Sequence, residues 1–170
     1  AVYRDQIANL KKVQERQYVE GERGDLDVVA CYTEGGTACV QIFYIRAGRN
    51  LGNKAFFPKI PGSTSEEEIL ESFIPQYYLD KDIPEEILVS HVPAQRDILQ
   101  QALSQTSGHK CSVRGKVRSD RKRWVEMALH NAKNALTARL SSQQGMKKRS
   151  EKLQEELGRD KLPARMECFD

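Results

Sequence analysis

The residues with the clearest chemical potential form a basic run at positions 110–123. Seven of these fourteen residues are Lys or Arg, and Asp120 is the one acidic residue among them. Three cations fall in the first turn of an expected helix, where the helix dipole disfavours them, so helix stability does not explain them. We therefore predict phosphate contacts with DNA, the alternative being a solvated basic edge that keeps a sheet from aggregating. The basic residues are Lys110, Arg114, Lys116, Arg118, Arg121, Lys122 and Arg123.

The charge of the whole chain is unevenly distributed. Residues 1–85 carry 10 Lys and Arg against 14 Asp and Glu, whereas residues 86–170 carry 17 against 10. A basic half is typical of proteins with a polyanionic partner, although ordinary solvated surfaces also produce it. A second and weaker candidate patch for DNA surrounds an expected hairpin and consists of Arg46, Arg49 and Lys54.

The histidines and cysteines do not indicate a catalytic or metal site. His91 follows an apolar run and has no neighbouring nucleophile, so a hydrogen-bonded structural histidine is favoured over a general base. The four cysteines form no Cys-x-x-Cys pair, and no histidine stands at ligand spacing, so we expect no bound metal. Cys31 and Cys39 lie in apolar runs, where reduced cysteines behave as small hydrophobic residues. This usage predicts a reducing, cytoplasmic environment.

The elements that position these residues begin with a predicted antiparallel meander. Glycine-containing turns separate β-favouring runs at 27–32, 37–46 and 51–57. The middle run is apolar on both faces, which places it inside a sheet that helices cover. Residues 63–65 then offer N-caps to a helix that Pro75 should kink or shorten.

The second half of the chain predicts two further strands and two helices. A strand is expected at 87–91, and a helix from Pro93 to the stop at Gly108, with inward-facing residues Ile98, Leu99, Ala102 and Leu103. The next strand, at 111–117, would alternate so that Lys110, Arg114, Lys116 and Arg118 share one face. A long helix should begin near Ser119, weaken at 141–145 and continue as a highly charged segment.

The order of elements is three strands, a helix, a strand, a helix, a strand and a helix. It predicts an α/β domain with a mixed five-stranded sheet, in the order of the ribonuclease H-like fold. We place this domain at residues 25–140. It follows an N-terminal helix and linker (1–24), and a long C-terminal helix leads into a charged helix and linker (141–163).

Ribonuclease H-like nucleases hold two metal ions with carboxylates on the first strand, on the first helix and near the end of the fourth strand. In this chain the centre of the first strand is residues 29–31, Asp27 comes too early, and the fourth strand ends at Ser90 and His91. Glu71 on the first helix is one candidate, and one carboxylate cannot hold a metal pair. We therefore predict that residues 25–140 are catalytically inactive.

Several segments resemble the C subunit family of the bacterial UvrABC nucleotide-excision-repair endonuclease, over essentially all 170 residues. Residues 1–7 are similar to the second half of the family's UVR motif, a helical hairpin. The central region of the family is similar to residues 25–29, 56–59, 119–121 and 131–136. The most specific match is Met-Glu-Cys-Phe-Asp at 166–170, which resembles the start of the family's C-terminal nuclease domain.

This resemblance implies a cytoplasmic DNA-repair protein of the SOS response, whose whole form cuts the damaged strand on both sides of a lesion with Mg²⁺. Residues 164–170 would begin the C-terminal nuclease domain, and Asp170 would be its first catalytic carboxylate in a site that is incomplete here. The UVR-type segment, through Tyr3, Ile7 and Leu10, would dock on the B subunit. By itself this chain is therefore expected to need no cofactor and to be inactive as a nuclease.

Three functions remain open from the sequence. The first is a non-catalytic module that positions DNA through the basic run. The second is a docking module for the B subunit without direct DNA contact, and the third, an independent enzyme, is disfavoured by the missing carboxylates. No apolar run approaches the roughly 18–20 residues that span a bilayer, and no small-molecule substrate is indicated.

Overall fold

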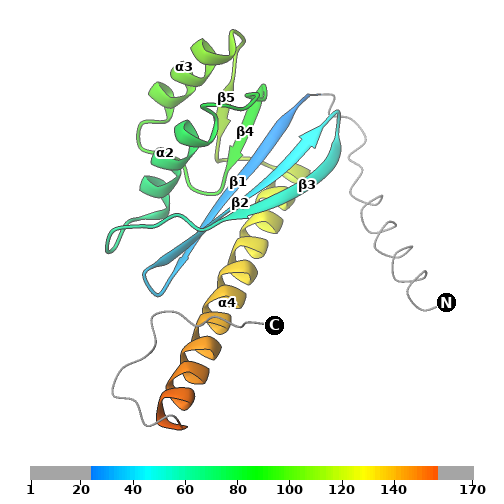
Figure 1. Ribbon diagram of the computed structural model, residues 1–170. Helices are drawn as coiled ribbons and strands as arrows, with labels where there is room; N and C mark the ends of the chain where they lie inside the picture. The colour runs from blue at the N-terminus through cyan, green and yellow to red at the C-terminus, as the bar shows by residue number, and fades with distance from the viewer. Residues whose placement is uncertain (1–23, 157–170) are drawn as a thin grey trace, which may run out of the picture. The chain divides into compact units, whose positions relative to one another are not determined.

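The computed structural model describes residues 24–156 of the chain (Figure 1). The predictions for Tyr3, Ile7, Leu10 and Asp170 lie outside these residues. The described part contains the predicted sheet and the helices that follow its strands.

The centre of the domain is a mixed five-stranded sheet with the order β3-β2-β1-β4-β5 (Figure 1). The first three strands form the predicted antiparallel meander, and β4 and β5 extend it in parallel with β1. This arrangement confirms the predicted ribonuclease H-like fold class. The strands are β1 (Leu26–Glu34), β2 (Thr37–Arg46), β3 (Arg49–Phe56), β4 (Glu86–Val89) and β5 (Ser112–Arg114).

Two hydrophobic cores lie on opposite faces of this sheet, because successive strand residues point to opposite sides. Val29 belongs to the core beneath α2 (Glu66–Tyr77) and α3 (Arg96–Ser107). Its neighbour Val28 belongs to the other core, which the start of α4 (Ser119–Glu156) covers with Trp124 and Ala128. The apolar character of both faces of β1 and β2 is thereby explained.

The ends of two helices follow the local sequence as predicted. Ser65 and Glu68 form a capping box at the start of α2, in which each side chain accepts a hydrogen bond from the other residue's backbone N–H. Gly108 ends α3 in the left-handed conformation, with φ of 72°. Pro75 lies inside α2, and the helix ends two residues later at Tyr77.

Helix α3 differs from the prediction in its start and in two positions that were expected to be buried. It begins at Arg96 rather than at Pro93, whose carbonyl accepts a hydrogen bond from the Arg96 N–H in the preceding turn. Leu99 and Leu103 face the core as expected, whereas Ile98 is 65% exposed and Ala102 is exposed as well. The apolar stripe of this helix is therefore narrower than its sequence indicates.

Strand β5 is shorter than the predicted strand at 111–117, so the prediction that four cations share one strand face is wrong. Only Arg114 among them lies within β5. At Gly115 the chain packs so closely that an added Cβ atom would lie 2.2 Å from Val92 Cγ2. Lys116 and Arg118 follow in the connection to α4, whose first residue, Ser119, has a φ of 52°.

Helix α4 continues through residues 141–145, where the sequence predicted a weaker pattern. Two glutamines favour the helix there, and Gly145 costs only about 1 kcal/mol in a helix interior. From Thr137 the chain forms a second compact unit. Its charged surface carries pairs one helical turn apart, such as Lys147 with Glu151.

Candidate nucleic-acid interface

Glu86, at the start of β4, binds two cations of the basic run. Arg121 Nη1 lies 2.8 Å from Glu86 Oε1, and Arg114 Nε lies 3.2 Å from the same oxygen. The Glu86 side chain is only 13% exposed, so these contacts fix the first turn of α4 to the sheet edge. In the sequence, Asp120 was the only acidic residue near these cations. Glu86 is far away in the chain and comes close to them only because β4 pairs with β5.

The other cations of the basic run are exposed and at most weakly paired. Lys122 lies 3.6 Å from Glu126, and Arg123 lies 3.8 Å from Asp120, with side chains that are 66% and 83% exposed. Surface pairs of this kind contribute little and exchange readily with other anions. Lys110, Lys116 and Arg118 are also exposed.

A cleft of about 630 Å³ opens between the connection after β5 and the side of α4. Lys116, Arg118 and Lys122 are its exposed cations, and they form what we call the cationic rim. Val117 and Val125 also line the cleft, and both are partly buried against the core beneath α4, so they form its apolar floor. The sequence showed the cations of this cleft, whereas the apolar floor emerges only from the folded chain.

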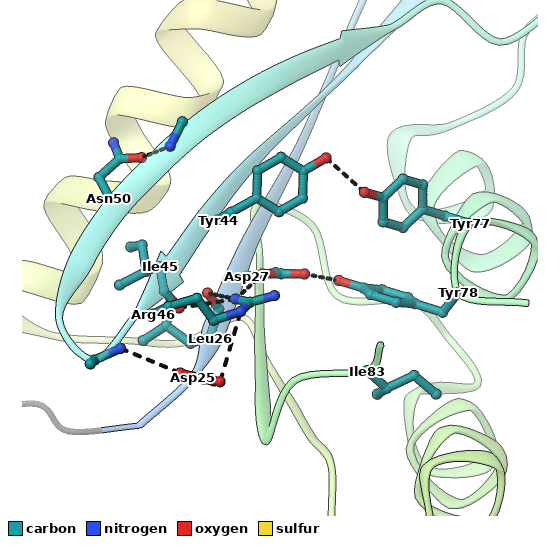
Figure 2. Close-up of polar contacts among 12 residues, drawn as sticks. Asp25, Leu26, Asp27, Tyr44, Ile45, Arg46, Asn50, Tyr77, Tyr78 and Ile83 are labelled. Atoms are coloured by element: carbon teal, nitrogen blue, oxygen red, sulfur yellow. Dashed lines mark hydrogen bonds and ion pairs between the residues drawn. The ribbon is translucent and has the colours of Figure 1, made fainter. Parts of the chain in front are cut away.

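The second predicted patch contains a buried ion pair (Figure 2). Arg46 Nη1 donates to Asp27 Oδ1 at 2.6 Å and to the carbonyl oxygens of Leu26 and Ile45 at 3.2 and 3.0 Å. Tyr78 donates to the other oxygen of Asp27 at 2.5 Å. Arg46 thus neutralises a carboxylate that is only 1% exposed, so we give it no part in the candidate interface.

Burial raises the pKa of the Asp27 carboxyl above its ordinary value, while the hydrogen bonds from Arg46 and Tyr78 act in the opposite direction. A second polar contact nearby joins the Tyr44 and Tyr77 hydroxyls at 2.6 Å (Figure 2). This polar cluster was missed by sequence reasoning, which dismissed Asp27 because of its position in the strand.

The other residues of the second patch remain at the surface. Arg49 and Lys54 are exposed, and Lys54 Nζ lies 5.2 Å from the centre of the Phe56 ring. Because Arg46 is paired with Asp27, this patch offers two exposed cations, fewer than the three of the cationic rim.

The strand and helix positions at which ribonuclease H-like nucleases hold metal ions carry other side chains in this chain. The Cys31 N–H donates to Ser90 Oγ at 3.0 Å, and Ser90 Oγ lies 2.9 Å from His91 Nδ1. Glu71 accepts the Gln95 N–H at 3.2 Å. Within residues 24–156, no group of three or more His, Cys, Asp and Glu side chains can hold a metal ion. These donors do not fit a pair of Mg²⁺ ions, which prefer carboxylate oxygens and water.

A family model described as the UvrC Ribonuclease H-like domain matches residues 25–139. The chain belongs to the UvrC family. UvrABC system protein C of Alkalilimnicola ehrlichii is 51% identical over the whole of this chain, and its counterpart from Methylococcus capsulatus is 43% identical. The chain spans 28% of the length of each relative. Among solved structures, Ciona intestinalis endonuclease V bound to DNA is 13% identical, with a TM-score of 0.32, over 68% of this chain and 60% of that one.

These matches confirm the family resemblance that the sequence showed. They also confirm that the chain contains a ribonuclease H-like domain. Among the described helices, none has the length and apolar character needed to cross a membrane.

Proposed function

We propose that this chain holds DNA in position during nucleotide excision repair and does not cut it. The observation that carries the proposal is the cationic rim, where Lys116, Arg118 and Lys122 surround one cleft. Glu86 binds both Arg114 on β5 and Arg121 on α4, so the two elements on either side of the rim are held together. A fixed array of exposed cations suits a phosphate backbone.

The contacts that we propose position DNA and do not select its sequence. Lys and Arg side chains on phosphates fix the register and orientation of a duplex, whereas base edges carry the sequence information. Lys110 and Arg123 are also exposed, although they do not line the cleft. A repair protein that acts on lesions in any sequence benefits from such contacts.

Incision belongs to other parts of the protein in this proposal. The resemblance places the first catalytic carboxylate at Asp170, where a separate nuclease domain would begin and would use Mg²⁺. Asp27 is neutralised by Arg46, and the donors near Ser90 and His91 do not suit magnesium. Residues 24–156 would then act in the cytoplasm as a scaffold within the UvrABC system.

Docking on the B subunit is the second candidate function, and exposed apolar side chains favour it. Ile98 and Leu79 are 65% and 73% exposed, and Val92 is 38% exposed beside the start of α3. A protein partner would cover such residues, whereas DNA would not. In this alternative the cationic rim would only be solvated.

Binding of a labelled duplex, followed by fluorescence anisotropy, separates the two functions. The test variant carries Lys116→Glu, Arg118→Glu and Lys122→Glu. A matched control carries the same change of charge at three exposed residues outside the basic run: Lys59→Glu, Lys81→Glu and Arg96→Glu.

We expect the rim variant to bind about tenfold to a hundredfold more weakly, and the control to change much less, because lost phosphate contacts add to long-range repulsion. Circular dichroism checks that both variants are folded. Equal affinity of the rim variant and the wild type would leave docking on the B subunit as the better account.

A further inference from the structure

The cleft beside α4 has a composition that phosphate binding alone does not require. Its exposed cations point to an anion, but Val117 and Val125 add an apolar floor between them. Both valines pack against the core beneath α4, so the floor is held in place by the fold. The cleft is open to solvent along much of its extent, and its volume of about 630 Å³ leaves room for one base that rests on the floor without being enclosed.

We infer that this cleft receives one unpaired nucleotide, with its base on Val117 and Val125 and its flanking phosphates on Lys116, Arg118 and Lys122. The inference rests on the proposed DNA contact of the same cleft. It adds a preference for DNA that contains an unpaired or distorted segment over fully paired DNA.

The apolar floor decides between paired and unpaired DNA. In a duplex the faces of the bases are stacked on one another, and the protein meets phosphates, sugars and base edges. Only a base that has left the stack offers an apolar face to the two valines. Leaving the stack costs least where pairing is already lost, so the floor contributes to binding mainly at such places.

The cationic rim supplies the other half of the site. A nucleotide that enters the cleft carries a phosphate on each side, and the three cations come from both walls, namely the connection after β5 and α4. Glu126 is the acidic residue of the lining, and it lies 3.6 Å from Lys122, which offsets its charge. Without a deep aromatic platform, the gain from the floor is modest and additive to the phosphate contacts.

The first test compares two labelled DNAs with the same number of phosphates. One is a duplex, and the other is the same duplex with a central unpaired stretch. We expect the wild type to bind the second about threefold to tenfold more tightly, as expected from the burial of one base face on two aliphatic side chains. The variant Val117→Thr with Val125→Thr replaces one methyl group of each valine by a hydroxyl and should lose this margin, while its affinity for the duplex, which depends on the cationic rim, should change much less. Circular dichroism checks that the variant is folded, because both valines also pack against the core.

The outcomes separate this inference from the proposed function. If the wild type binds both DNAs equally, or if the threonine variant weakens both alike, the unpaired-nucleotide site is wrong. If the variant with Lys116→Glu, Arg118→Glu and Lys122→Glu binds both DNAs as the wild type does, the proposed DNA contact itself is wrong. If that rim variant loses duplex binding but the wild type shows no preference for the DNA with the unpaired stretch, the inference is wrong and the proposed function stands.

A second measurement avoids mutation of the cleft. In methyl nuclear magnetic resonance spectra of the chain, a short oligothymidylate should shift the signals of Val117 and Val125, whereas inorganic phosphate should not. Shifts with phosphate alone would show an anion site without a base. Shifts on addition of the B subunit, but not of the oligonucleotide, would show a protein-docking cleft. Either result overturns the inference.

Discussion

At the scale of single residues, the buried pair of Asp27 and Arg46 shows how one side chain can change the interpretation of a basic patch. The carboxylate stands on β1 with its two oxygens bound by Arg46 and Tyr78 (Figure 2). A buried carboxylate needs such partners, because its charged form loses its hydration on folding. Arg46 therefore stabilises the folded domain by pairing with Asp27, and it is not counted among the residues of a DNA-binding patch.

Replacing Arg46 by Met should destabilise the domain strongly and in a pH-dependent way. Removing one partner of a buried ion pair costs about 3–5 kcal/mol, because the other charge remains without compensation. Burial already raises the pKa of Asp27 above 3.8, and loss of Arg46 raises it further. The folded state then binds a proton that the unfolded state releases, so stability is retained in acid and lost as the pH rises.

Urea unfolding of Arg46→Met at about pH 4.5 and pH 7 measures this effect, and the free-energy loss should be smaller at the lower pH. Arg123→Met is the matched control, since its side chain is 83% exposed and pairs only weakly with Asp120. An equal loss at both pH values would show that the Arg46 stem contributes through packing and that its charge does not matter.

The buried cysteines allow a second prediction at this scale. Burial raises the pKa of Cys31 to about 12 and that of Cys111 to about 11, so both thiols stay protonated at pH 8. In a Cys168→Ser variant, a disulfide reagent should therefore react slowly with the native chain and rapidly after denaturation. Rapid reaction of a native thiol would contradict the burial of Cys31, Cys39 and Cys111.

At the scale of elements, Glu86 joins β4, β5 and α4 through two arginines. Substitution by Gln removes one negative charge beside the basic run and weakens the contacts of residue 86 with Arg114 and Arg121. We expect a loss of about 1–2 kcal/mol in stability, as for weakened hydrogen bonds to a charged group. Duplex affinity should rise about twofold to fivefold, because the local charge becomes more positive.

Thermal unfolding and anisotropy measure the two effects of Glu86→Gln in the same preparation. The variant Glu85→Gln is the control for charge alone, since Glu85 is the exposed residue directly before Glu86 and does not line the cleft. A folded Glu86→Gln variant with weaker DNA binding would mean that the fixed positions of the two arginines matter more than the added charge.

The elements also show which parts of the fold were predictable. The capping box at Ser65 and the stop at Gly108 are local, so the sequence predicted both helix ends. Strand β5 ends just before Gly115, which packs closely against Val92, a residue far away in the chain. Such a contact leaves no periodic signal, and the strand was therefore predicted too long.

The candidate site was predictable to a similar extent. The cations of the basic run were visible as a cluster of like charges, because they are neighbours in the sequence. Their division into bound and exposed cations follows from Glu86, and the apolar floor follows from the packing of Val117 and Val125. Both depend on how distant segments meet, which one sequence does not reveal.

At the scale of the whole molecule, the domain matched by the UvrC model consists of one sheet with a core on each face. One of these cores supports the floor of the cleft, and the start of α4 carries part of the cationic rim. The fold thus presents exposed cations next to a packed core. This organisation suits a scaffold that holds a polyanion.

The salt dependence of duplex binding tests the central claim most directly. With the three rim cations on phosphates, the logarithm of the association constant should fall with the logarithm of the salt concentration at a slope of about −3. The variant with Lys116→Glu, Arg118→Glu and Lys122→Glu should bind weakly and lose most of this slope. A wild-type slope near zero, or the same slope in that folded variant, would contradict the account.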